Sequence, residues 1–330
     1  MKKVFTILVL GIITWQSLFS KTITDMAGRT VIVPETIDRV FPYDPKTSIL
    51  IFPIIGEKMV ATSMLPGKKD FTYISKAYTG LPEVDVKNIE EVVTYLPQVI
   101  IAGFYTKNDK NGMVFSLGKR LNIPVVLIDL SIDKMDQTYL FLGELFKKDS
   151  KPYVVFLQSM YNNIALLQKS HSPITATVYY TLGASGLLTD PSGSKHTEVF
   201  DYLKIPNAAK VEIPSAGHAQ VNLEQVLLWN PDYIFTSAFR GENNAYLLMT
   251  TDAKWKSIGA VKNNKMYKVP TQPMGWFDHP PSVNRVPGLL WLCELFYNAG
   301  ADPTRNKICA FYSLFYQYNL SSAEYSLLFK

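Results

Sequence analysis

The four histidines are the side chains of this sequence best suited to hold a metal. They are His171, His196, His218 and His279, and no two have the HxxxH or HExxH spacing that builds a zinc site on one helix. His218 stands in a glycine-containing loop, and His196 stands in the loop 190–198 that precedes a predicted helix. Imidazole suits iron, nickel and copper. We therefore expect His218 and His196 to complete the coordination of a metal that has open positions; the alternative for each is a polar loop residue.

The remaining histidines have other expected roles. His279 lies between Asp278 and Pro280 and should form a local hydrogen bond, whereas His171 should be solvated. Every histidine lies beyond residue 170. A naked manganese or zinc ion would need three or four ligands that converge from both halves of the chain. This one-sided distribution favours a metal already wrapped by a small ligand, or an oxyanion.

Aromatic and cationic side chains gather in the loops that follow predicted strands. Aromatic faces beside positive charges suit a planar or catecholate-like anionic metal complex. Arg240 directly follows an apolar strand and is the preferred anion anchor, whereas Arg285 opens a helix and has a structural pairing with a carboxylate as its alternative. The loop lysines Lys68 and Lys69 are expected to be solvated, and Lys107 adds a further positive charge. The predicted ligand-binding residues are Tyr43, Tyr73, Tyr105, Arg240, His218, Trp276 and Arg285.

Strands that alternate with helices must position these loops. Apolar runs of the buried-strand type occupy residues 39–41, 60–62, 99–102, 125–128, 177–181, 233–236 and 266–269. Helical segments separate several of them, which predicts an α/β fold with mainly parallel sheets. In open sheets of this kind, ligands bind beyond the carboxyl ends of the strands. The loops named above fall at those ends.

Two segments in different halves of the chain match each other. They read NIEEVVTYLP at 88–97 and NLEQVLLWNP at 222–231. Each predicts a helix that is capped by asparagine, carries Glu90 or Glu224 in its first turn and ends at proline before a strand. The repeat predicts two Rossmann-like lobes; chance similarity of two helix–strand units is the alternative. A helical pattern at 150–171, about 30 Å long, should join a lobe at 21–149 to a lobe at 172–330 as one long α-helix.

The first 20 residues have the pattern of a secretory signal peptide. Two lysines precede the apolar run Val4–Ile13, which is too short to span a bilayer, and Ser20 is the small residue at the expected cleavage site. We expect an exported chain, located in the periplasm of a bacterium with two membranes. The 33 Lys and Arg against 28 Asp and Glu argue against a nucleic-acid binder. Cys293 and Cys309 are too few for a disulfide scaffold, and we expect two buried free thiols; a disulfide between them, which an exported chain can form, is the alternative.

Several segments together resemble class III periplasmic binding proteins, the receptors of ABC importers for iron–siderophore, haem, cobalamin and related metal chelates. They are TDMAGRTVIVP at 24–34, the repeat just described, WKSIGAVKNNKMYKVP at 255–270, WFDHPPSVNR at 276–285 and GLLWL at 288–292. The last two are similar to a branch usually labelled iron-complex transport. A closer resemblance to the iron or nickel chelate receptors of Helicobacter-type bacteria is suspected.

The resemblance implies two rigid lobes joined by one helix, with the ligand between them. It also implies that one glutamate on each lobe docks onto arginines of an inner-membrane ABC permease, which works with a cytoplasmic ATPase. By position these are Glu90 and Glu224, and Glu91 is the rival in the first lobe. The alternative is that both glutamates only stabilise their helices.

The predicted function is therefore a monomeric periplasmic receptor that captures a metal chelate and performs no chemistry on it. We expect a ferric siderophore; a nickel–histidine-type complex, haem, cobalamin or molybdate are the alternatives. No intrinsic cofactor is expected, because the metal, iron first and nickel second, arrives within the ligand. A two-lobe enzyme such as a glycosyltransferase is the distant alternative, but the sequence has no GxGxxG or Walker A pattern to cradle phosphates.

Overall fold

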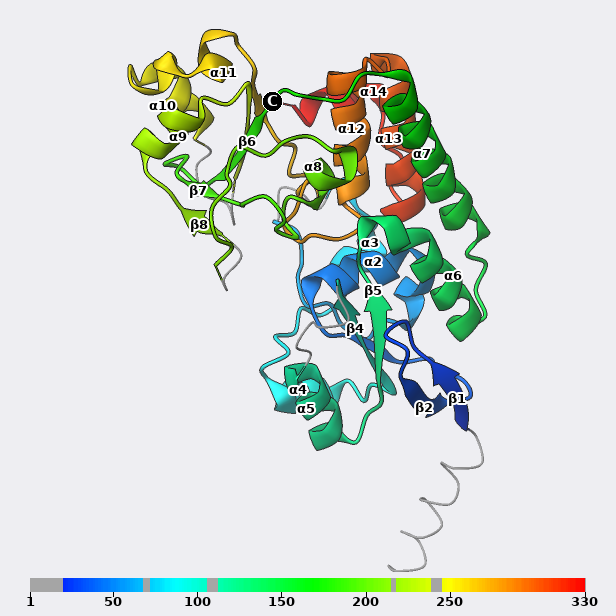
Figure 1. The fold of residues 1–330 in the computed structure, drawn as a ribbon. Helices are drawn as coiled ribbons and strands as arrows, with labels where there is room; N and C mark the ends of the chain where they lie inside the picture. Colours follow the sequence, from blue (N-terminus) through cyan, green and yellow to red (C-terminus); the bar gives the residue numbers. More distant parts are fainter. Residues whose placement is uncertain (1–19, 68–71, 106–111, 215–217, 239–244, 330) are drawn as a thin grey trace, which may run out of the picture. The chain divides into compact units, whose positions relative to one another are not determined.

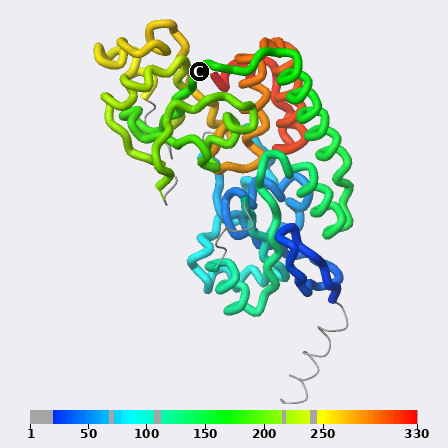
Figure 2. Tube along the Cα trace, in the orientation of Figure 1, coloured from blue at the N-terminus to red at the C-terminus, as the bar shows by residue number. Residues whose placement is uncertain are grey.

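The computed structural model describes residues 20–67, 72–105, 112–214, 218–238 and 245–329 (Figure 1). They form two compact units. Unit 1 holds the described residues up to Leu65 together with Ala77–Val154, and unit 2 holds Pro66–Lys76 and Val155–Lys330. Along the tube in Figure 2, the blue-to-green chain belongs to unit 1 and the green-to-red chain to unit 2, apart from the short Pro66–Lys76 segment. The predicted α/β fold class is confirmed.

Unit 1 is built on a three-stranded parallel sheet in the order β3-β4-β5. Its strands are β3 (Val40–Pro42), β4 (Val99–Phe104) and β5 (Val125–Asp129). Its helices are α2 (Pro45–Ile55), η1 (Gly56–Lys58), α3 (Lys76–Thr79), α4 (Ile89–Thr94), α5 (Gly112–Leu121), η3 (Ile132–Lys134) and α6 (Met135–Phe146). Every residue of the central strand β4 is buried, as expected of a parallel strand covered on both faces.

One predicted strand is wrong. Residues 60–62 form no strand; the chain there makes only isolated bridges, Val40 with Met59 and Thr62 with Glu83. An apolar triplet alone therefore did not distinguish a strand from a buried connection.

An antiparallel hairpin, β1 (Ser20–Thr24) with β2 (Thr30–Pro34), precedes the sheet of unit 1. At its turn the buried Asp25 carboxylate accepts hydrogen bonds from the backbone of Arg29 and of Leu127 on β5. The Arg29 guanidinium binds the same carboxylate at 2.6 Å and also donates to the Val125 carbonyl. Gly28 completes the turn at φ +81°, a conformation that glycine adopts without strain. The Asp25–Arg29 pair thus ties the hairpin to β5.

Unit 2 contains a five-stranded mixed sheet in the order β10-β9-β6-β7-β8. The strands are β6 (Val178–Leu182), β7 (Leu188–Thr189), β8 (Ala219–Gln220), β9 (Tyr233–Ser237) and β10 (Met266–Lys268). β6, β9 and β10 run parallel, whereas β7 and β8 add antiparallel pairings that the sequence did not predict. The shorter helices of this unit are α8 (Glu198–Leu203), α9 (Leu223–Trp229), α10 (Tyr246–Thr251), η4 (Trp255–Ser257) and α11 (Gly259–Lys262).

The long helices of unit 2 lie beside one another. They are α7 (Lys151–Ser170), α12 (Arg285–Tyr297) and α13 (Ala301–Phe315), followed by the short α14 (Ser322–Leu327) (Figure 1). Phe156 of α7 packs against Phe311 and Phe315 of α13, with ring centroids 6.3 and 5.6 Å away. α7 begins in unit 1 and continues in unit 2. No helix in the described part of the chain combines the length and apolarity needed to cross a membrane.

The two halves of the sequence repeat form the same local structure. Asn88 caps α4 and Asn222 caps α9, each accepting a hydrogen bond from the backbone three residues on. A strand follows each helix, β4 in unit 1 and β9 in unit 2. The predicted helix–turn–strand units are thus confirmed in both places.

Candidate metal centre

Three of the four histidines meet in unit 2. The ring centroids of His196 and His218 lie 4.8 Å apart, and that of His279 lies 5.8 and 5.6 Å from them. One ligand nitrogen from each ring lies within 4.8 Å of the other two. The three side chains are only 12–21% exposed. The predicted metal-binding pair, His196 and His218, is therefore joined by a third imidazole.

Two buried carboxylates hold these rings. Asp190 lies 2.8 Å from His218 Nδ1. Asp278 lies 2.5 Å from His279 Nδ1 through one oxygen and 3.3 Å from His196 Nδ1 through the other. The local hydrogen bond expected of His279 is thus present, but the same ring also belongs to the cluster. Each imidazole faces a carboxylate through Nδ1.

The pairing of β7 with β8 explains how Asp190 reaches His218. Thr189 of β7 pairs with Ala219 of β8 in an antiparallel ladder. The next residue beyond the pair on one strand is Asp190, and on the other it is His218. Antiparallel register places such residues side by side. Two short strands that the sequence did not reveal therefore bring together residues 28 positions apart.

A tight loop between β10 and α12 presents Asp278 and His279. Asn284 donates a hydrogen bond to the backbone carbonyl of Asp278 at 3.3 Å and another to that of Gly275. A Cβ at Gly275 would lie 2.3 Å from the Asp278 carbonyl oxygen, so this close approach requires glycine. Beneath the loop, the buried Tyr180 of β6 donates its hydroxyl to the Asp278 carboxylate at 2.6 Å.

Charge and burial act on the two carboxylates in opposite directions. Burial alone would raise the pKa of Asp278, but the neighbouring His279 and His196 outweigh it and hold the pKa below its usual range. Burial raises the pKa of Asp190, which the His218 hydrogen bond only partly offsets. Burial, with the adjacent Asp278 charge, raises the pKa of Tyr180 well above 10, so this phenol stays a donor. The two imidazoles beside Asp278 thus favour its ionised form.

Two predicted ligand residues of unit 2 are buried away from solvent. The Trp276 side chain is completely buried and donates to the Tyr312 hydroxyl at 3.1 Å. Arg285 is likewise fully buried; its guanidinium binds Glu198 of α8 and the Ser282 carbonyl. The structure thus gives Arg285 its alternative role, a structural pairing with a carboxylate, and both side chains belong to the core rather than to an open ligand surface.

The predicted tyrosines lie in different places. In unit 1, Tyr43 follows β3 and Tyr105 follows β4, both half-buried, and the Lys46 ammonium lies 5.3 Å from the centre of the Tyr105 ring. In unit 2, the Tyr73 ring meets that of Tyr318 edge to face at 5.9 Å. Tyr43 and Tyr105 thus belong to unit 1, and Tyr73 belongs to the Pro66–Lys76 segment of unit 2. The loop cations Arg240, Lys68, Lys69 and Lys107 and the signal segment 1–19 lie outside the described residues.

Both predicted docking glutamates are exposed. Glu90 is in the first turn of α4 and Glu224 in the first turn of α9. The rival Glu91 instead accepts a hydrogen bond from Asn88 at 3.0 Å, within the cap of its own helix. Glu90 is therefore the more available carboxylate in unit 1.

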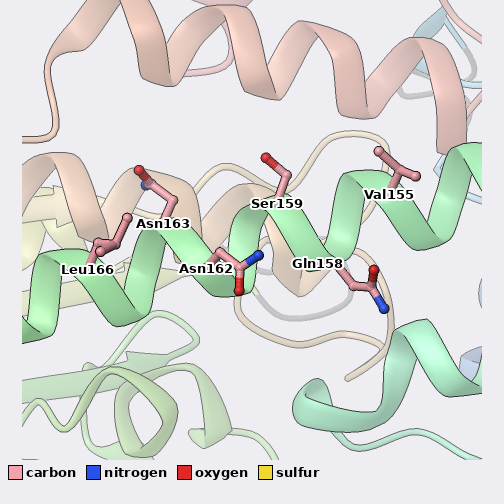
Figure 3. A pocket seen from close by; sticks show the side chains of 6 residues that line it. All are labelled: Val155, Gln158, Ser159, Asn162, Asn163 and Leu166. Atoms are coloured by element: carbon pink, nitrogen blue, oxygen red, sulfur yellow. The ribbon is translucent and has the colours of Figure 1, made fainter.

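A separate depression lies on the surface of α7. Its lining side chains, Val155, Gln158, Ser159, Asn162, Asn163 and Leu166, all come from this one helix (Figure 3). None of these side chains carries a charge, and four of the six are neutral polar groups.

Sequence reasoning missed Asp190, Asp278 and Tyr180. Asp278 adjoins His279 in the sequence, and Asp190 directly follows the apolar Leu187-Leu-Thr189 run. These two sequence positions could have indicated a role for both aspartates in the site. Tyr180 lies within a strand and has no local mark that distinguishes it from a core aromatic. Both free cysteines were predicted as buried; Cys293 is buried and Cys309 is partly exposed.

Comparisons with known proteins agree with this fold. A family profile described as periplasmic binding protein matches residues 54–273. The molybdate-binding protein MolA of Haemophilus influenzae is 23% identical over 330 residues, covering 90% of each chain. An ABC transporter solute binding protein from Sulfurospirillum deleyianum has a similar structure, with a TM-score of 0.79 at 24% identity over 93% of this chain and 98% of that one. A Helicobacter pylori CeuE structure with Ni-His gives a TM-score of 0.63 at 12% identity, over 94% and 99% of the two chains.

Proposed function

Because the chain belongs to the periplasmic binding protein family, we propose that it captures a metal chelate and delivers it to an inner-membrane ABC importer. It is a transport protein rather than an enzyme, and proteins of this kind work with a membrane permease and an ATPase. The family implies a periplasmic location. Export through cleavage near Ser20 is part of the proposal.

The choice of cargo rests on one observation, the convergence of His196, His218 and His279. Three imidazoles beside one another suit a transition metal that has open coordination positions. A siderophore that occupies all six positions of iron leaves none for protein nitrogen. The cluster therefore fits a metal held by a small ligand, such as a nickel–histidine-type complex, better than the ferric siderophore expected from the sequence.

Molybdate is the second candidate, because MolA is 23% identical over nine tenths of both chains. An oxyanion would need hydrogen-bond donors, which imidazoles supply when protonated. The two cargoes then respond to pH in opposite ways. Acid protonates the metal-binding nitrogens and weakens metal capture, whereas it strengthens capture of an oxyanion.

Titration followed by tryptophan fluorescence tests the proposal. Trp276 lies in the same loop as His279, so binding at the cluster should change its emission. The panel for residues 21–330 is nickel with and without histidine, a ferric catecholate and a ferric hydroxamate siderophore, haem, cobalamin and molybdate, each at pH 6 and pH 8. Sub-micromolar binding of one metal complex, weaker at pH 6, supports the proposal. Flat curves across the panel contradict it.

Docking completes the proposed function. Glu90 and Glu224 offer one exposed carboxylate on each of two repeated helix–strand units. A permease built from two similar halves presents equivalent surfaces, so equivalent anions suit it. We assign both glutamates to permease docking, separate from cargo capture.

A further inference from the structure

The histidine cluster has a feature that a polar loop does not need: every ring turns the same nitrogen toward a carboxylate. Nδ1 of His218 is hydrogen-bonded to Asp190 at 2.8 Å and Nδ1 of His279 to Asp278 at 2.5 Å, whereas Nδ1 of His196 lies 3.3 Å from Asp278 without a hydrogen bond. A carboxylate accepts, so Nδ1 of His218 and of His279 carries the hydrogen. When the ring is neutral, the lone pair then lies on Nε2. A carboxylate behind the Nδ1 of a histidine is the arrangement that orients a metal-bound imidazole and strengthens its basicity.

The charges beneath the rings point to the same kind of ligand. Asp190 is 0% and Asp278 is 1% exposed, and each has one carboxylate oxygen with no hydrogen-bond partner among the described residues. Buried carboxylates are costly unless positive charge compensates them. The ion pairs described for these two carboxylates involve only histidines. A doubly charged cation over neutral imidazoles would balance two carboxylates, whereas a dianion would face them.

We infer that this cluster binds a divalent transition-metal ion directly, through Nε2 of His196, His218 and His279, with Asp190 and Asp278 as positioning residues. This inference rests on the proposed function and narrows its cargo to nickel, cobalt, copper or zinc, bare or with a small ligand that leaves three positions open. All three nitrogens come from unit 2. A one-lobe site thus replaces the expectation that a metal ion would need ligands from both halves of the chain.

The geometry sets what must happen on binding. A tetrahedral metal at about 2.1 Å from each nitrogen holds the nitrogens about 3.4 Å apart. The ligand nitrogens of the cluster lie within 4.8 Å of one another. The widest separation must therefore shorten by up to about 1.4 Å on binding, through rotation of the side chains.

The test uses the metal-stripped chain, residues 21–330, titrated with Ni²⁺, Zn²⁺ and Co²⁺ against a chromophoric chelator. We expect one equivalent to bind, and the visible absorption of bound Co²⁺ to report nitrogen ligands. His218→Gln and His279→Gln should abolish that absorption band. Asp278→Asn should lower the affinity by about 10–100-fold and shift the band, because it disturbs ring orientation rather than removing a ligand. His171→Gln, an exposed histidine at the end of α7, is the matched control and should change nothing.

The outcomes separate this inference from the proposed function. If divalent ions fail to bind, or bind equally well to His218→Gln and His279→Gln, the inference is overturned. If the same preparation then binds a ferric chelate or molybdate, the receptor function is supported and only the divalent-metal site is rejected. If none of the tested ligands binds, both the receptor function and the divalent-metal site are rejected. Circular dichroism of each variant establishes folding, and if Asp278→Asn does not fold, Asp190→Asn replaces it as the test of positioning.

Discussion

The Tyr180 hydroxyl donates to the Asp278 carboxylate at 2.6 Å, and both side chains are almost wholly buried. Tyr180 lies on β6, and Asp278 lies in the loop between β10 and α12, 98 residues later. The bond fixes the carboxylate on which His279 and His196 rest. It therefore links the sheet of unit 2 to the candidate metal centre.

Loss of the Tyr180–Asp278 hydrogen bond should lower the free energy of unfolding more than loss of the hydrogen bond of the adjacent Tyr179. Tyr180→Phe removes a hydrogen bond to a buried charge and should cost about 1.5–3 kcal/mol in the free energy of unfolding. Tyr179→Phe is the matched control, because its hydroxyl donates to the neutral Gly186 carbonyl at 2.9 Å; it should cost about 1 kcal/mol. Urea denaturation of the two variants gives the comparison. Equal losses would mean that the Asp278 bond has no special strength.

The pH dependence of stability should carry the signature of Asp278. Its folded pKa lies below the usual value, so it stabilises the native state above about pH 4, and that stabilisation is lost as pH falls toward the folded pKa. The Tm difference between the parent and Asp278→Asn, both metal-free, should therefore be largest near neutral pH and shrink below about pH 4. Calorimetry from pH 3 to pH 7 measures it. A constant difference would contradict the assignment.

Removing the partner of Arg285 should be severe. Glu198→Gln leaves a fully buried guanidinium without its carboxylate and should cost about 3–5 kcal/mol. Asp302→Asn removes the partner of Arg305 from a pair whose carboxylate is 75% exposed, and should cost less than about 1 kcal/mol. Chemical denaturation of both variants is the measurement. Comparable losses would show that burial does not distinguish the two pairs.

The hairpin at the start of the described chain depends on Asp25. Asp25→Ala leaves the buried Leu127 amide and the Arg29 guanidinium without their acceptor, and should cost at least about 2 kcal/mol. Asp38→Ala, which loses only a surface pair with Lys58, should cost less than about 1 kcal/mol. Hydrogen exchange at Leu127 provides a local readout. Unchanged protection there would refute the anchoring role of Asp25.

Permease docking should separate from cargo binding. The double variant Glu90→Ala/Glu224→Ala should abolish uptake of the cargo identified by titration while leaving its affinity unchanged, because both carboxylates are exposed on α4 and α9. Glu212→Ala, another exposed carboxylate, is the control. Transport into proteoliposomes containing the permease and ATPase measures the effect. A loss of affinity in the double variant would overturn the docking assignment.

The sequence by itself determined the local elements. Asparagine caps, first-turn glutamates and proline stops act within a few residues, so the repeated helix–strand units at 88–104 and 222–237 were predictable in type and position. The parallel strands were also predictable, because a buried strand appears in the sequence as a compact apolar run. The hydrophobic triplet 60–62 shows the limit of such patterns, because register with a neighbour decides whether a strand forms.

Only the tertiary structure decided which side chains work together. Arg285 and Trp276 have the types expected in a ligand site, yet packing buries both against Glu198 and Tyr312. His279 looked locally satisfied, yet a tight loop and an antiparallel pair of two-residue strands bring it beside His196 and His218. These contacts join residues distant in the chain, and their free energy depends on packing, burial and register, which no local pattern encodes.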